Sequence, residues 1–157
     1  MITKYKPILS LDFDGTINSY RSGWKGPRNI PDAAMPGALQ FIVEAQEFFT
    51  VHIFSTRSNY FGGRRAMKHW LRQEYNKLNY NTEKNDLPEW FMNRINWFTI
   101  EPFHILFKDT VADIISDIKF PRHKPPALVT IDDRAIQFQG VWPSPEELLK
   151  FKPYKPK

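Results

Sequence analysis

Ile8-Leu9-Ser10-Leu11-Asp12-Phe13-Asp14-Gly15-Thr16 is the stretch of sequence that decides the fold. Its apolar start, bounded by Pro7 and Asp12, predicts a buried strand. Residues i and i+2 of an extended segment face the same side, so this strand presents Asp12 and Asp14 to one pocket. Gly15 permits a turn away from the sheet. A solvated Asp-Gly turn is the plain structural alternative for this motif.

Two further apolar runs end in polar residues. Val51 to Phe54 predicts a strand followed by Ser55-Thr56-Arg57, where hydroxyl and backbone N–H groups can hold a phosphoryl oxygen. Arg57 can add a bidentate contact to the same phosphoryl group. Leu128 to Ile131 predicts a strand followed by Asp132 and Asp133. Two adjacent buried acids are improbable as plain structure, because buried aspartate is rare unless it is paired or bound to a metal.

Amphipathic patterns between these strands predict helices. The expected helices run from about Pro36, in the first turn, to Phe49; over about 64–78; from Asp86, with Pro88 in the first turn, to about Phe98; and briefly after Ser144. The stretch 100–120 is left open between strand and helix. Alternating strands and helices predict an α/β fold, a three-layer Rossmann-like sandwich with a central parallel sheet and helices on both faces. We expect one domain over 1–157, with a basic tail at 150–157 that is extended or frayed.

Composition sets outer limits on function. The chain has 157 residues, 41% of them hydrophobic, which is too apolar for a disordered protein. It has no cysteine, so disulfides and thiolate zinc sites are excluded. No apolar run is long enough to span a membrane, and the start resembles no signal peptide, so we expect a cytoplasmic protein without membrane partners. The net charge of +5 favours phosphate-bearing partners, although basic surfaces also serve solubility.

The predicted strand ends should meet at one edge of a parallel sheet, because ligands of such sheets bind beyond the carboxyl ends of the strands. The edge would then hold up to four carboxylates, Asp12, Asp14, Asp132 and Asp133. Each like-charge pair at about 4 Å costs on the order of 4 kcal/mol at an effective dielectric near 20. A divalent cation with oxygen ligands offsets this repulsion, and Mg²⁺ is the usual choice beside a phosphate.

The order of these motifs resembles the haloacid-dehalogenase superfamily over about residues 7–143. The resemblance is carried by Asp-Phe-Asp-Gly-Thr after a strand, Ser after the next strand, a downstream Lys, and Asp-Asp after a later strand. The run Lys124-Pro-Pro-Ala followed by Ile131-Asp-Asp-Arg-Ala is further similar to small bacterial and phage members without a cap domain. Asp14 and Thr16 favour the phosphatase branch of that superfamily over the dehalogenase branch.

The resemblance implies a phosphohydrolase in which Asp12 attacks phosphorus and forms an aspartyl-phosphate. Asp14 would protonate the leaving oxygen and then activate water. The implied Mg²⁺ ligands are Asp12, the backbone carbonyl of Asp14, Asp132, and Asp133 directly or through water. Ser55 would bind the transferring phosphoryl group and Lys124 would neutralise it, with Lys108 and Lys119 as competitors for that role. Substrate contacts are assigned to Gly15, Thr16, Thr56, Arg57 and Arg134.

The substrate class is left open. The segment after Gly15 is too short for a cap domain, and at most a small aromatic insert occupies 86–107, so we expect an open site flanked by loop 18–30. The aromatic and basic residues of this loop could stack a base and pair with phosphate, or simply anchor the loop. A nucleic-acid end and a small phosphorylated molecule are both compatible substrates. A phosphotransferase with another acceptor, and a non-catalytic module binding nucleic acid or phosphate, are the alternatives.

Overall fold

The structure, a computed structural model, describes residues 5–80, 87–95, 103–137, 139–141 and 143–154. It is an α/β fold built on a parallel sheet of three strands in the order β2-β1-β3. The strands are β1 (Ile8–Leu11), β2 (Thr50–Ile53) and β3 (Val129–Ile131). All three strands were predicted, and the observed bounds differ from the predicted ones by at most one residue at each end.

The central strand β1 determines the register of the sheet. Leu9 pairs with Val51 on one side and with Val129 on the other. A further parallel bridge joins His52 of β2 to Lys119, so the chain near 119 continues the sheet beyond β2. Because β1, β2 and β3 are parallel and in register, their carboxyl ends share one edge, as predicted.

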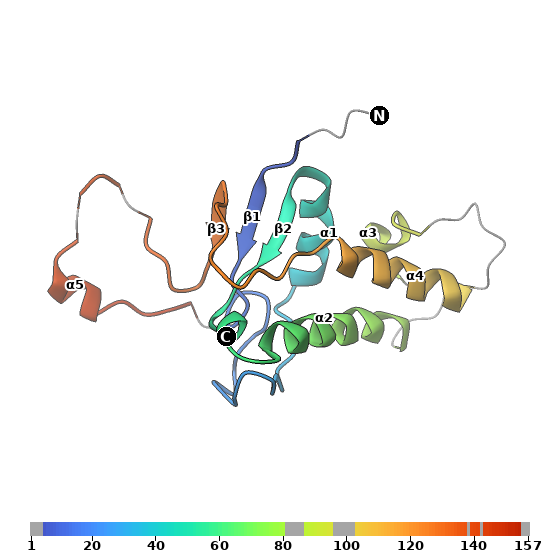
Figure 1. Cartoon of the computed structure of the whole chain (residues 1–157), viewed down its shortest axis with the longest axis horizontal. Coiled ribbons are helices and arrows are strands. Elements are labelled where there is room, and N and C mark those ends of the chain that lie inside the picture. Colours follow the sequence, from blue (N-terminus) through green and yellow to red (C-terminus); the bar gives the residue numbers. More distant parts are fainter. Residues whose placement is uncertain (1–4, 81–86, 96–102, 138, 142, 155–157) are drawn as a thin grey trace.

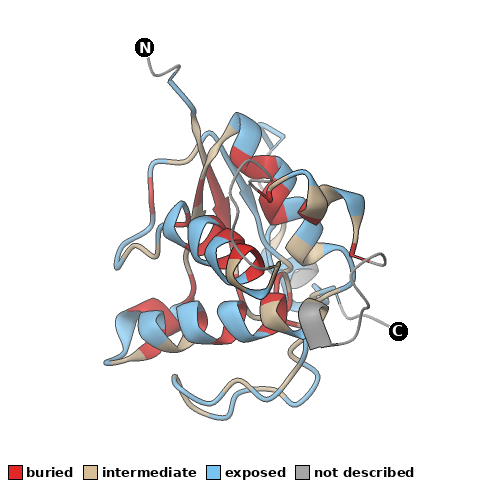
Figure 2. Ribbon diagram, turned by 90° about the vertical axis from the view of Figure 1, so that its right-hand side faces the viewer, coloured by how far each residue is buried: buried red, intermediate tan, exposed pale blue. Residues whose placement is uncertain are grey.

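The helices lie mainly on the β2 side of the sheet in Figure 1, and α5 lies on the β3 side. They are α1 (Ala38–Phe48), η1 (a 3-10 turn, Thr56–Asn59), α2 (Gly63–Tyr80), α3 (Glu89–Met92), α4 (Phe103–Ser116) and α5 (Pro145–Leu149). The predicted stripe of α2 is buried at Met67, Leu71 and Tyr75. Figure 2 shows buried residues on the helix faces turned toward one another and toward the sheet.

Two predicted helix starts were wrong. Pro36 precedes α1 rather than lying in its first turn, because Gly37 takes the N-cap position with a positive φ of 78°. Pro88 is likewise the N-cap of α3, a helix of only one turn that ends at Met92 instead of reaching Phe98. Asp86 and residues 96–102 lie outside the described residues.

The described part of the aromatic segment 86–107 packs into the core. Phe91 of α3 is fully buried, and its ring centroid lies 4.8 Å from that of Phe107 in α4. Residues 103–116, left open between strand and helix, are helical and contact α2. Trp90, Phe91, Phe103 and Phe107 therefore contribute to the core, while Trp97 and Phe98 lie outside the described residues.

The described residues after Phe120 are far less buried than the rest. All three residues of β3 are exposed, in contrast to the interior positions of β1. Helix α5 begins at Pro145 as predicted. The predicted extended tail has neither helix nor strand over 151–154, and the N–H of Tyr154 donates to the carbonyl of Asp133 over 3.2 Å.

Among the described residues, no helix combines the length and apolar character needed to cross a membrane.

Candidate active site

The acids of the first motif lie at the sheet edge where the parallel strands end. The backbone N–H of Asp12 donates to the carbonyl of Ile131 over 2.9 Å, which keeps the chain after β1 beside the chain after β3. Asp12 and Asp14 both line a hollow of about 280 Å³, which we call the acidic hollow. Its other lining residues are Ser55, Thr56, Asp132, Arg134, Tyr20 and Trp24. All three strand ends therefore contribute to one site.

Three carboxylates converge at this edge. Asp12, Asp132 and Asp133 each offer an oxygen, and these oxygens all lie within 4.8 Å of one another. The side chain of Asp133 is only 5% exposed, and its Oδ1 is buried without a hydrogen-bond partner. A buried, unpartnered carboxylate oxygen is costly unless a cation or donor meets it. The donor set and its spacing fit a hard divalent cation with oxygen ligands.

Burial and neighbouring negative charge oppose the ionisation of Asp12 and Asp133. Burial raises the pKa of Asp12 to about 7, with a hydrogen bond to the backbone at Phe13 acting in the opposite direction. The neighbouring negative charges, chief among them Asp132 and Asp133, are the smaller contributions to this raised pKa of Asp12. Burial also raises the pKa of Asp133, against the favourable charge of Arg134. A cation at this point would favour the ionised form of every one of these acids.

Gly15 and Thr16 are packed around Asp133 and do not line the acidic hollow. Gly15 has a φ of 93°, and a side chain there would bring its Cβ within 2.7 Å of Asp133 Oδ2. The hydroxyl of Thr16 accepts a hydrogen bond from the backbone N–H of Asp133 over 3.2 Å. The first motif thus positions an acid of the last one, while substrate contacts by Gly15 and Thr16 stay predictions.

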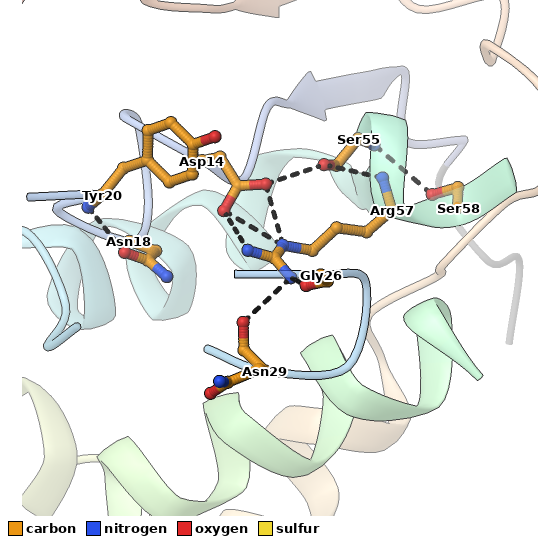
Figure 3. A network of polar contacts seen from close by, with 8 residues as sticks. All are labelled: Asp14, Asn18, Tyr20, Gly26, Asn29, Ser55, Arg57 and Ser58. Atoms are coloured by element: carbon orange, nitrogen blue, oxygen red, sulfur yellow. Dashed lines mark hydrogen bonds and ion pairs between the residues drawn. The ribbon is translucent and has the colours of Figure 1, made fainter. Parts of the chain in front are cut away.

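Arg57 is the main partner of Asp14. Its guanidinium donates from Nε to Oδ2 of Asp14 over 2.8 Å and from Nη2 to Oδ1 over 3.0 Å, a bidentate ion pair (Figure 3). The side chains of Arg57 and Asp14 are 1% and 12% exposed. The bidentate contact predicted between Arg57 and phosphate is therefore made to Asp14 in this structure.

The same guanidinium holds the loop that covers the site. Its Nη1 donates to the carbonyls of Gly26 and Asn29, over 2.7 and 3.3 Å. The indole of Trp24 lies over the guanidinium, 4.7 Å from ring centroid to Cζ, in a cation–π contact. Loop 18–30 is thus tied to Asp14 through one buried arginine, as Figure 3 shows for Gly26 and Asn29.

Ser55 is buried at the start of η1. Its Oγ accepts a hydrogen bond from the backbone N–H of Arg57 over 3.3 Å and lies 3.5 Å from Oδ2 of Asp14. Ser58 completes a capping box with Ser55. This cap keeps Ser55 next to Asp14 of the first motif. The neighbouring Thr56 is exposed and lines the hollow.

Arg134 brings positive charge to the acidic hollow. Its Nε lies 3.5 Å from Oδ2 of Asp133. None of the three lysines considered for catalysis is among the described residues that line the hollow: Lys108 and Lys124 are exposed elsewhere, and Lys119 lines a separate groove.

Sequence reasoning missed two features of this site. It did not pair Arg57 with Asp14, because nothing in the local pattern says that a side chain after a strand turns inward. It also did not predict the groove that Arg64, Arg65 and Lys68 line at the start of α2. Matching basic residues at 119–123 were the available signal, and only the fold brings them alongside.

No family model matches this chain, and searches of curated proteins and of solved structures likewise find no match.

Proposed function

We propose that this chain is a Mg²⁺-dependent phosphohydrolase that cleaves phosphomonoesters through an aspartyl-phosphate at Asp12. The observation that carries the proposal is the convergence of Asp12, Asp132 and Asp133 within 4.8 Å, together with the unpartnered Oδ1 of Asp133. Three acids from two neighbouring strand ends form a costly arrangement in an apoprotein. A bound cation beside a phosphate would offset this repulsion between the acids.

The residues at hand fit Mg²⁺. Asp12, Asp132 and Asp133 would hold it, together with the backbone carbonyl of Asp14 that the family resemblance implies. When bound, the ion supplies positive charge that offsets the repulsion between carboxylates and phosphate. Asp12, whose pKa is about 7 in the absence of a metal, would then be ionised and nucleophilic at neutral pH.

The reaction divides into two displacements at phosphorus. In the first, a carboxylate oxygen of Asp12 bonds to phosphorus while the bond to the leaving oxygen breaks and Asp14 gives that oxygen a proton. In the second, Asp14 takes a proton from water, the water oxygen bonds to phosphorus, and the bond to Asp12 breaks to release phosphate. Ser55, beside Asp14, would hold the transferring group.

Arg57 and Arg134 have separate parts in this proposal. Arg57 is a positioning residue, since its fork fixes the orientation of Asp14 at the hollow. Arg134, at the rim, would contact the phosphate directly. The resemblance gives Lys124 the role of neutralising the phosphate. Because Lys124 does not line the hollow in this structure, that role requires the segment 121–127 to move when substrate binds.

We also propose that the sheet is the centre of a three-layer Rossmann-like sandwich of the haloacid-dehalogenase type. The strand order β2-β1-β3, with acids after β1 and β3 and a serine after β2, supports this assignment. The parallel bridge between His52 and Lys119 supports a further strand position next to β2.

One observation favours a second candidate, a non-catalytic module that binds phosphate or nucleic acid. Both oxygens of Asp14 accept hydrogen bonds from Arg57, so the acid is not free to exchange a proton in this conformation. A binding module needs no such exchange. The two candidates differ in whether phosphate is released.

Hydrolysis of p-nitrophenyl phosphate with and without Mg²⁺ tests the proposal. We expect Mg²⁺-dependent turnover that falls at least about 10³-fold in Asp12→Asn, because the nucleophile is lost. Asp109→Asn, an exposed acid of α4, is the matched control and should keep full activity. Mass spectrometry of acid-quenched enzyme should find phosphate on wild-type chain and none on Asp12→Asn. Phosphate and Mg²⁺ binding with no turnover on any phosphoester would favour the binding module instead.

A further inference from the structure

A wide groove lies on the other side of η1 from the acidic hollow. It has a volume of about 820 Å³ and runs between the start of α2 and the segment 118–123. Its cationic lining residues are Arg64, Arg65, Lys68, Lys119, Arg122 and, when protonated, His123. We call it the basic groove.

The groove has no acidic lining residue among those the structure describes. The ion pairs between described residues use other cations: Arg57, Lys77, Arg94 and Arg134. The whole chain has 22 lysines and arginines, and five of them line this one groove. Such a concave, uniformly positive surface attracts a polyanion.

Aromatic side chains stand at the rim beside these cations. Phe61 is 95% exposed and Tyr60 is 51% exposed, and both line the groove. Large exposed aromatic residues are costly to solvate, and they offer flat faces on which bases stack. Stacking residues beside a track of cations are typical of surfaces that bind single-stranded nucleic acid.

An aromatic pair connects the groove to the acidic hollow. The ring centroids of Tyr60, in the groove, and Trp24, in the hollow, are 5.8 Å apart. The 3-10 turn η1 also runs from Thr56 at the hollow to Ser58 and Asn59 at the groove. A chain lying in the groove therefore meets the hollow across Tyr60 and Trp24.

We infer that the basic groove binds single-stranded nucleic acid and directs its terminal phosphate into the acidic hollow, an inference that rests on the proposed phosphohydrolase function. The cations follow the phosphodiester backbone, and Phe61 and Tyr60 stack bases. Anionic lipid would meet a flat or convex surface more readily than a groove, and an acidic peptide has no use for the stacking faces. Duplex nucleic acid keeps its bases out of reach of both aromatic residues.

The test measures binding without turnover. An oligothymidylate of about 12 nucleotides, matched to the upper range of single-strand site sizes, carries a terminal phosphate at one end and a fluorophore at the other. Its affinity is followed by fluorescence anisotropy in EDTA at several salt concentrations. The groove variant is Arg65→Gln/Lys68→Gln/Arg122→Gln; Arg64 is left intact because it donates to the carbonyl of Phe120. The charge-matched control is Arg72→Gln/Lys108→Gln/Lys150→Gln, three exposed cations outside the groove.

We expect the groove variant to bind at least about tenfold more weakly, with the slope of log K against log salt reduced by about 2, since three phosphate contacts are lost. The control variant should bind within about twofold of wild type, because it loses the same charge elsewhere. Phe61→Ala should weaken binding at least about fivefold through lost stacking. Equal losses in both triple variants would overturn the inference, as would equal affinity for a duplex or for polyglutamate.

A second measurement separates this inference from the proposed function. The groove variant should hydrolyse p-nitrophenyl phosphate like wild type but release terminal phosphate from the oligonucleotide with a kcat/KM at least about tenfold lower. Turnover of p-nitrophenyl phosphate without oligonucleotide binding would refute nucleic-acid binding by the groove and support the phosphohydrolase function. Groove-dependent binding without turnover of any phosphoester would refute the phosphohydrolase function and support nucleic-acid binding by the groove.

Discussion

The acidic hollow and the basic groove meet at η1, yet their charges are held in opposite ways. At the hollow, Asp12, Asp14 and Asp133 are partly buried. Beside it, Arg57 is the one fully buried cation among the described residues, and its partners include Asp14, Gly26, Asn29 and the ring of Trp24. In the groove, the lysines and arginines are exposed side chains. The first arrangement costs folding free energy; the second costs little.

This difference supports the proposed assignment of chemistry to the hollow and of recognition to the groove. Like charges gathered in a partly dry site destabilise the fold and persist only when a ligand or a reaction needs them. Solvated cations on a helix face tolerate change, because water screens them. Substitutions in the hollow should therefore affect stability and activity together, whereas substitutions in the groove should affect only binding.

The largest effect of a substitution should come from Arg57→Met, which removes the buried cation and keeps a long apolar side chain. Asp14 would lose its partner, and we expect a loss of about 3 kcal/mol in the free energy of unfolding, measured by urea denaturation. Arg72→Met, an exposed arginine of α2, should change it by less than about 0.5 kcal/mol. In a double-mutant cycle, Asp14→Asn should recover part of the loss. Equal effects of the two arginine variants would remove the contrast between buried and solvated charge.

An effect of similar size should appear in the pH dependence of the metal-free protein. The pKa of Asp12 is about 7 in the fold and near 4 in the unfolded chain, so the folded state binds more protons between these values. Stability should fall as pH rises from about 4 to about 7, on the order of 4 kcal/mol, because ionisation of Asp12 is resisted only in the fold. Thermal unfolding in EDTA measures this.

Asp12→Asn provides the control for that titration, since it should flatten the decline and raise the unfolding temperature above pH 7. Mg²⁺ should reverse the sign for wild type, because the ion binds the ionised acids and binds more tightly as pH rises. A metal-free protein whose stability rises with pH over this window would contradict the strain assigned to the hollow.

The smallest effect should come from Trp24→Leu. The cation–π contact with Arg57 is partly exposed, and its loss should lower the free energy of unfolding by about 1 kcal/mol. If Trp24 also guides a nucleic-acid end, KM for the phosphorylated oligonucleotide should rise while KM for p-nitrophenyl phosphate changes little. The exposed Phe48→Leu, remote from both regions, is the matched control and should leave both constants unchanged.

The part of the fold nearest the site was the most predictable from sequence. Short apolar runs ending in Asp12, Ser55 and Asp132 predicted three strands, and parallel strands bring such ends to one edge. Long apolar stripes with helical spacing predicted α1 and α2, because one face of each helix has to be buried.

The remainder depended on tertiary contacts that local patterns do not encode. The buried residues of 103–116 lie on one face of a helix. In the sequence, however, the short apolar runs 105–107 and 114–115 also fit strands, so the choice between helix and strand was left open. Nothing in the residues around Arg57 distinguishes it from a surface arginine, and its burial depends on contacts with Asp14 and with loop 18–30. The basic groove is formed by two segments about fifty residues apart in sequence, so the pattern of either segment alone does not predict it.

The hydrogen bonds from Arg57 to Gly26 and Asn29 have a consequence for local unfolding. One guanidinium holds both these carbonyls and the carboxylate of Asp14, so the loop and the acid should open as a single cooperative unit. Limited proteolysis at 24–30 would then report the orientation of Asp14 without any substrate. A protease that cleaves the opened loop would free Asp14 from its fixed orientation while leaving the sheet intact.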